Sequence, residues 1–144
     1  MQLADSSIDR PVPVPDEVSE GFWEAVKEHG DLRIQQCDQC AAYYHPPVPQ
    51  CFTCLTSGLA FVPVSGRGEV AGWTVMYEKL VAGFEGQVPY IGVLVALDED
   101  PEVQLAANLI DADPTAVHVG MKVTAVFETI RDGWVLPQFT PSES

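Results

Sequence analysis

The chain has few cations, and they do not cluster. Seven Lys and Arg face 21 Asp and Glu among its 144 residues, so the formal net charge is −14 at pH 7. Residues 60–144 alone carry a net charge of −8, from four cations and twelve carboxylates. Nucleic-acid binding depends on clustered Lys and Arg that neutralise phosphates. We therefore expect no nucleic-acid partner.

Long apolar stretches are also missing. The longest run, residues 91–97, is far shorter than the roughly 20 residues that a membrane-spanning helix needs. No basic-then-apolar leader opens the sequence, because Asp5 and Asp9 lie where its apolar part would be. These observations predict a cytoplasmic protein with no membrane partner.

No motif marks an active site. The chain lacks a Gly-x-Ser-x-Gly elbow, a phosphate-binding loop and a dinucleotide fingerprint. His29, His45 and His118 are scattered, and the carboxylates form no recognisable catalytic pair. We expect no catalytic residue in this chain, and hence no enzyme activity of the chain by itself.

Cysteine is scarce, but its spacing is informative. Cys37 and Cys40 form one Cys-x2-Cys pair, and Cys51 and Cys54 form a second pair ten residues later. Two such turns can place four thiolates around one tetrahedral Zn²⁺. A disulfide framework is more typical of small secreted proteins, and a thioredoxin-like redox site would need one pair only. The spacing predicts one structural zinc ion per chain, with no open position for catalysis.

Glycine is missing at two positions where zinc knuckles usually have it. Ala41 and Leu55 each follow the second cysteine of a pair, where the backbone turns left-handed. A side chain raises the free energy of that conformation. The sequence therefore predicts either weaker metal retention or one distorted knuckle.

The chain divides into four parts. Residues 1–15 predict an extended, proline-rich arm, because Pro11, Pro13 and Pro15 alternate with Val at its end. Residues 16–30 predict a helix, residues 31–60 the zinc-binding region, and residues 61–141 a unit with the two-residue period of β-strands.

The predicted helix begins at an Asp16 N-cap and ends at Gly30. Phe22 and Trp23 give it an apolar side. These two rings either cover the β unit or form a partner-binding face.

The β unit contains five predicted strands. Their shared faces are Ala71, Trp73, Val75 and Tyr77; Ile91, Val93, Val95 and Leu97; Val103, Leu105, Ala107 and Leu109; Val123, Ala125 and Phe127; and the stretch 134–139. Asp132-Gly133 predicts a type I′ hairpin turn before the last strand. Five short strands favour a partly closed barrel of the OB type. The segment 78–89, with Phe84, is an unusually apolar loop that either borders a ligand face or folds back onto the barrel.

Several short stretches, in their order along residues 16–141, carry a resemblance to a known family. They are Phe22-Trp23-Glu24-Ala25, residues 32–37, Pro46-Pro47, residues 66–70, Pro89-Tyr90-Ile91, residues 120–123 with 127–128, and residues 136–139. The sequence resembles acyl-CoA-associated proteins in which an N-terminal helix and a rubredoxin-like zinc ribbon precede an OB-fold barrel. The fold class expected is therefore mainly β, with these three parts. Ala41 and Leu55 depart from the family pattern, whereas the four cysteines keep it.

Members of that family look like companion subunits of thiolase-superfamily enzymes. One such enzyme is the thiolase-like aldolase of bacterial steroid side-chain degradation, which cleaves a β-hydroxyacyl-CoA by a retro-aldol reaction. The resemblance implies that the partner holds the catalytic residues, while this chain stabilises the complex and helps form the acyl-CoA path. It also implies two copies of each chain. The residues expected to face the partner or the acyl-CoA are Phe22, Trp23, Phe84 and Tyr90.

Three alternatives remain open at this point. The chain could accompany a condensing or acyl-transferring thiolase instead of an aldolase. It could be a nucleic-acid-binding OB module that stacks bases on Trp73, Tyr77 and Tyr90, although its charge argues against that. It could also bind acyl-CoA alone, but with seven cations we expect most contacts to the CoA phosphates to come from a partner.

Overall fold

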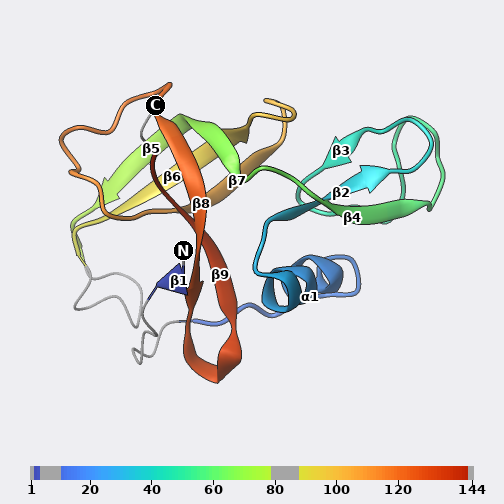
Figure 1. Cartoon of the computed structure of the whole chain (residues 1–144), viewed down its shortest axis with the longest axis horizontal. Helices are drawn as coiled ribbons and strands as arrows, with labels where there is room; N and C mark the ends of the chain where they lie inside the picture. The colour runs from blue at the N-terminus through green and yellow to red at the C-terminus, as the bar shows by residue number, and fades with distance from the viewer. Residues whose placement is uncertain (1, 4–10, 79–87, 143–144) are drawn as a thin grey trace.

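One α-helix and two β-sheets form the part of the chain that the computed structural model describes, residues 2–3, 11–78 and 88–142. The helix lies beside a small sheet, and the larger sheet curls into a barrel (Figure 1). This arrangement confirms the predicted class, mainly β with one helix. Most of the predicted arm and the apolar loop with Phe84 lie outside the described residues. No described helix is long and apolar enough to cross a bilayer.

The helix α1 (Glu20–His29) starts later than predicted and ends as predicted. Its N-cap is Ser19, because Asp16 organises a turn ahead of the helix. The Asp16 carboxylate accepts hydrogen bonds from the Val18 and Ser19 N–H groups, at 3.1 and 2.8 Å. At the other end Gly30 adopts φ 65°, and its N–H closes the last turn. The left-handed conformation there explains the glycine.

The inner side of α1 is packed closely. Phe22 and Val26 are buried, and Trp23 is partly buried against the same cluster. Gly21 lets the helix approach the small sheet, since a Cβ at this position would lie 2.6 Å from the Phe61 ring. The apolar side of the helix therefore covers the core. This agrees with the interpretation that Phe22 and Trp23 cover the β unit.

The small sheet carries the cysteine region. It has the antiparallel order β3-β2-β4, with β2 (Arg33–Cys37), β3 (Tyr43–Tyr44) and β4 (Leu59–Pro63). The buried Gln35 side chain holds the following loop, because it donates to the Val48 carbonyl at 2.9 Å and accepts from the Val48 N–H at 2.8 Å. The sheet therefore positions both the first knuckle and the loop that leads to the second.

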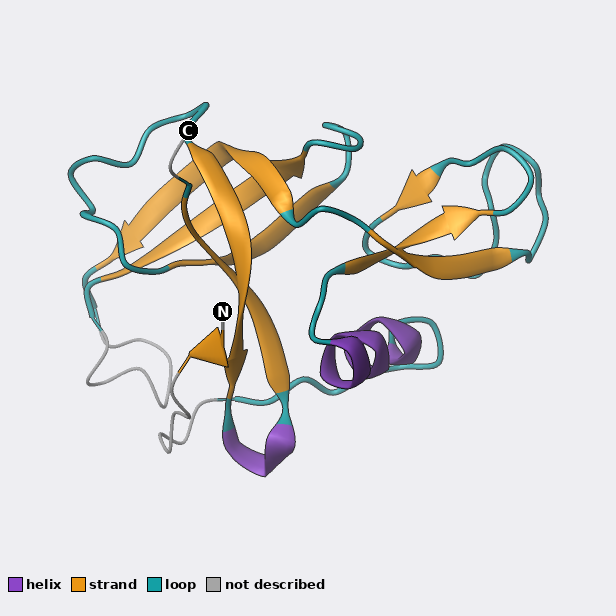
Figure 2. Cartoon of the chain, viewed as in Figure 1, coloured by secondary structure: helices purple, strands orange, loops and turns teal. Residues whose placement is uncertain are grey.

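The larger sheet closes on itself. Its strands are β5 (Arg67–Met76), β6 (Tyr90–Leu97), β7 (Gln104–Leu109), β8 (Lys122–Thr129) and β9 (Val135–Pro141). They pair in the ring β5-β6-β7-β9-β8 and back to β5, with β7–β9 as a parallel pair. This is the five-stranded barrel expected from the alternation (Figure 2). A two-residue strand, β1 (Gln2–Leu3), lies parallel to β8.

The predicted face of β5 is wrong in part. The register against β6 shifts between Val70 and Gly72, so that Ala71 is an extra, exposed residue at a bulge. Val70, which the prediction left out, is buried. Beyond the bulge Trp73 pairs with the buried Val93 but stays 43% exposed. A bulge reverses the inward and outward positions that follow it.

Two other barrel features agree with the sequence. The predicted face of β6 is entirely buried: Ile91, Val93, Val95 and Leu97. The hairpin between β8 and β9 has φ 61° at Asp132 and 76° at Gly133, the two positive values of a type I′ turn. This turn contains the short 3-10 helix η1 (Arg131–Gly133).

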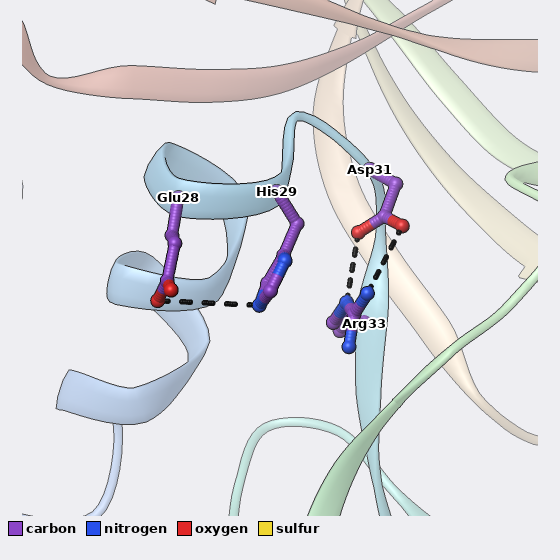
Figure 3. A network of polar contacts seen from close by, with 4 residues as sticks. All are labelled: Glu28, His29, Asp31 and Arg33. Atoms are coloured by element: carbon purple, nitrogen blue, oxygen red, sulfur yellow. Dashed lines mark hydrogen bonds and ion pairs between the residues drawn. The ribbon is translucent and has the colours of Figure 1, made fainter.

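One buried apolar cluster joins the three parts. Phe22 and Val26 from α1 and Leu32 and Ile34 from the small sheet belong to the same cluster as the barrel core. At the turn from α1 to β2, Arg33 contacts Asp31 through two side-chain bonds of 2.9 and 3.4 Å (Figure 3). The helix, small sheet and barrel are therefore packed together by shared burial.

Candidate metal centre and the neighbouring groove

The four cysteines meet at one end of the small sheet. Their Sγ atoms all lie within 4.8 Å of one another, and those of Cys40 and Cys51 are 3.6 Å apart. No disulfide joins them. A tetrahedral ion with Zn–S bonds of about 2.3 Å holds its sulfurs about 3.8 Å apart. The set therefore fits one four-coordinate structural metal, as the Cys-x2-Cys spacing predicts.

The thiols hold their protons unevenly. A hydrogen bond with Tyr44 lowers the pKa of Cys51 to about 6. A hydrogen bond with Cys40 raises the pKa of Cys54 to about 12. Four neighbouring sulfurs cannot all become anionic unless a cation offsets their repulsion. A divalent ion does this, since thiols that coordinate a metal are deprotonated.

Both knuckles form despite the missing glycines. Ala41 has φ 64° and Leu55 has φ 62°. Each N–H donates to the carbonyl of the first cysteine of its pair, Ala41 to Cys37 at 3.0 Å and Leu55 to Cys51 at 2.9 Å. The left-handed turns are thus confirmed, and the two knuckles share the same backbone bonding. The strain expected from the sequence resides at these two residues.

We expect Leu55→Gly to stabilise the metal-loaded chain by about 1 kcal/mol, because glycine has no Cβ to strain a left-handed residue. Leu55 is 69% exposed, so little packing is lost. Calorimetric melting of the zinc-loaded protein measures the effect. Ala42→Gly is the matched control, since Ala42 is not among the positive-φ residues and should lose stability. A loss of equal size in both variants would contradict strain at Leu55.

An apolar groove lies where helix, small sheet and barrel meet. Its volume is about 430 Å³. Phe22 and Trp23 of α1 line one side, His45 and Pro46 of the loop after β3 line another, and residues of β7 and β9 complete it. We call this the junction groove. It is the feature on which two of the predicted partner-facing residues converge.

The four predicted partner-facing residues are placed differently. Phe22 is only 4% exposed and belongs to the buried cluster, so it offers little surface to a partner, and its contact with a partner or acyl-CoA stays a prediction. Trp23 lies edge-on to Phe22 at a centroid distance of 5.2 Å and keeps part of its surface accessible. Tyr90 lines a separate depression of about 350 Å³. Phe84 lies outside the described residues.

Sequence reasoning missed two residues near these sites. His45 packs on Phe22 with ring centroids 5.0 Å apart, and burial lowers its pKa to about 4. Its Nδ1 is buried, and no hydrogen-bond partner for it occurs among the described residues. Tyr44 places its hydroxyl 3.2 Å from Cys51 Sγ. The only sequence signal for either was proximity to the cysteines.

The fold and the site define a four-cysteine zinc-ribbon protein with an OB-fold barrel. Residues 23–60 match the family model "ChsH2, rubredoxin-like zinc ribbon domain", and residues 61–128 match "ChsH2, C-terminal OB-fold domain". A "DUF35 domain-containing scaffold protein" of Pyrococcus furiosus is 32% identical over 111 residues, 77% of this chain and 79% of that protein. The chain belongs to the ChsH2/DUF35 family, which confirms the resemblance.

Two further relatives carry functional names. A chain of the solved structure "Ltp2-ChsH2(DUF35) aldolase" superposes with a TM-score of 0.81 at 29% identity, over 90% of this chain and 98% of that one. The "3-oxo-4,17-pregnadiene-20-carboxyl-CoA hydratase alpha subunit" of Mycobacterium tuberculosis is 36% identical over 122 residues, 85% of this chain. The match spans 37% of that subunit, so this chain corresponds to a part of it.

Proposed function

We propose that this chain is the non-catalytic subunit of a thiolase-like aldolase complex that acts on acyl-CoA thioesters. The observation that carries the proposal is its match to 98% of a chain in the Ltp2-ChsH2 aldolase. The site supports it, because four cysteine ligands leave a metal no open position for substrate. The chain then stabilises the partner, whose residues perform the carbon–carbon cleavage.

The metal of this subunit is, in our proposal, one structural Zn²⁺. Four thiolates form a donor set that suits zinc, which has no redox chemistry of its own. Iron also binds four thiolates, and elemental analysis of protein purified without added metal separates the two. One equivalent of zinc is the result expected from the proposal.

The proposed substrate class is a steroid-derived acyl-CoA. The name of the mycobacterial relative includes both a pregnadiene skeleton and a carboxyl-CoA thioester. A place in steroid side-chain degradation is part of this proposal, and that name and the aldolase match together support it. A companion of a condensing or acyl-transferring thiolase is the second candidate. The name of the Pyrococcus relative, a scaffold protein, fits a non-catalytic companion of either kind.

The charges of the chain support a partner that holds the CoA phosphates. Arg33 is engaged by Asp31, and Lys122 is engaged by Glu69 (Figure 3 shows the first pair). These two cations are therefore partly neutralised by neighbouring carboxylates. A nucleic-acid-binding function is disfavoured for the same reason, since it needs clustered, available cations.

Co-expression with a thiolase-like aldolase tests the proposal. We expect a stable complex with two copies of each chain, measured by light scattering, that cleaves a β-hydroxyacyl-CoA. Condensation without cleavage would favour the second candidate. Two chains that purify separately and remain fully active would contradict the subunit function.

Within that complex, we expect Trp23→Ala to weaken partner binding about 30-fold or more, as for a buried aromatic anchor at an interface. Trp23 is chosen because, of the two helix residues that line the junction groove, it is the one that is partly accessible, whereas Phe22 is buried. Calorimetric titration of the two purified chains gives the dissociation constants. Glu24→Ala is the control, an exposed neighbour on the same helix. Equal affinities for both variants would exclude the junction groove from the interface.

A further inference from the structure

The Tyr44 hydroxyl lies between the small sheet and the second knuckle. Its oxygen is 3.2 Å from Cys51 Sγ, and it accepts the Phe52 N–H at 3.0 Å. A metal-bound thiolate has no proton, so the hydroxyl must be the donor to sulfur. Its single proton and one lone pair are then both used. This is the geometry of a side chain that orients a metal ligand.

We propose that Tyr44 is a positioning residue of the metal centre, which holds the Cys51 thiolate by a hydrogen bond and ties the second knuckle to the small sheet. The proposal rests on the metal centre alone and does not depend on the aldolase partner. It assigns a function to a residue outside the Cys-x2-Cys pairs.

Cys51 needs such a donor more than an exposed ligand does. The residue is 0% exposed, so water cannot solvate its charge. The Cys54 N–H also donates to the Cys51 sulfur, with an N···S distance of 3.4 Å. In the first knuckle, the Gln39 N–H lies at the same 3.4 Å from Cys37. The Tyr44 hydroxyl is the shorter contact to Cys51 and the side-chain donor of its second knuckle, and a buried anion that loses one of its few donors is less stable.

The position of Tyr44 is fixed by its surroundings. Its backbone pairs with Gln35 in β2, the strand that ends at Cys37 of the first knuckle. Its ring packs edge-on against Phe52, with centroids 5.4 Å apart and an interplanar angle of 81°. Tyr44 thus links the strand that carries one pair of ligands to the turn that carries the other.

Tyr44→Phe tests the proposal, since it removes the hydroxyl and keeps the ring. Tyr43→Phe is the matched control, because Tyr43 is the adjacent residue of the same strand. Loss of a group that hydrogen-bonds to a metal ligand typically lowers metal affinity by about 10- to 100-fold. We expect Tyr44→Phe to weaken Zn²⁺ binding by about tenfold or more, measured by competition with a chromophoric chelator, and Tyr43→Phe to leave it unchanged.

A spectroscopic signature separates ligand positioning from a general loss of stability. In the Co²⁺-loaded full-length chain, we expect Tyr44→Phe to shift the thiolate-to-cobalt charge-transfer bands, because one sulfur loses a hydrogen bond. Tyr43→Phe should leave them unmoved. Native affinity and native bands in Tyr44→Phe would overturn the proposal.

If Tyr44→Phe alone does not fold, the test is made in the Leu55→Gly variant, in which the strain of the second knuckle is relieved. The double variant with Leu55→Gly is then compared with Leu55→Gly alone, by the same two measurements and with the same expected differences. Failure of the parent chain to bind any metal would instead contradict the metal centre itself. The two failures are therefore distinguishable.

Discussion

Removal of the metal is expected to unfold the cysteine region while the barrel stays folded. The reason is the small size of the structure around the ligands. β3 has two residues, and the segments that join it to the cysteines are turns. In isolated zinc-finger peptides, metal binding contributes about 10–16 kcal/mol of folding free energy. The barrel, in contrast, has a closed ring of strands around buried side chains.

Hydrogen exchange by NMR on chelator-treated protein measures this effect. We expect the amide of Cys51, which donates to the Thr56 carbonyl at 2.9 Å in the folded region, to lose its protection. The amides of the barrel strands β6 and β8 should keep theirs. Cys51→Ser should reproduce the loss without chelator, whereas Ser57→Ala, close to the cluster but not a ligand, should not. Unchanged protection at Cys51 in the metal-free chain would show that the region folds without an ion.

Local patterns in the sequence were sufficient to predict the four-cysteine cluster and most of the barrel. The Cys-x2-Cys pairs each fold through one turn, so spacing alone determines which thiolates can share an ion. Alternation predicts the buried face of β6 for a similar reason, since successive strand residues point to opposite sides. The Asp132-Gly133 turn needs only the conformations of two adjacent residues.

Features that depend on tertiary contacts could not be predicted in this way. The bulge at Ala71 is a property of the pairing between β5 and β6. Gly72 beside it is a residue type that often marks a bulge, but the position of the shift depends on the partner strand. The start of α1 moved from Asp16 to Ser19 because Asp16 bonds to the turn before the helix, a choice that both positions permit. Local propensity does not distinguish between such alternatives.

The junction groove and the contact from Tyr44 to Cys51 depend even more on distant parts of the chain. The groove combines the helix, the loop after β3, and the strands β7 and β9, which are widely separated in sequence. Tyr44 reaches Cys51 because β3 pairs with β2, and the pairing sets the direction of its side chain. Sequence periodicity predicts neither the pairing of β3 with β2 nor the direction of the Tyr44 side chain.

Phe22→Ala is the second variant for which we expect a large effect, a loss of about 3–5 kcal/mol in the free energy of unfolding. Phe22 is 4% exposed within the cluster that joins helix, small sheet and barrel, and its ring contacts both Trp23 and His45. Truncation leaves a cavity at the point where the three parts meet. Guanidinium denaturation of the zinc-loaded chain gives the value, with Glu24→Ala expected to change it by no more than about 0.5 kcal/mol.

Comparison with Trp23→Ala turns this stability effect into a test of the interface. The two aromatic rings touch, but one is core and the other is partly accessible. We expect Phe22→Ala to lower stability and, once the variant is folded and zinc-loaded, to bind the partner nearly as the parent chain does. Trp23→Ala should instead weaken binding more than stability. If Phe22→Ala kept full stability and lost partner binding, Phe22 would contact the partner directly, and the closure of helix, small sheet and barrel over its ring would be wrong.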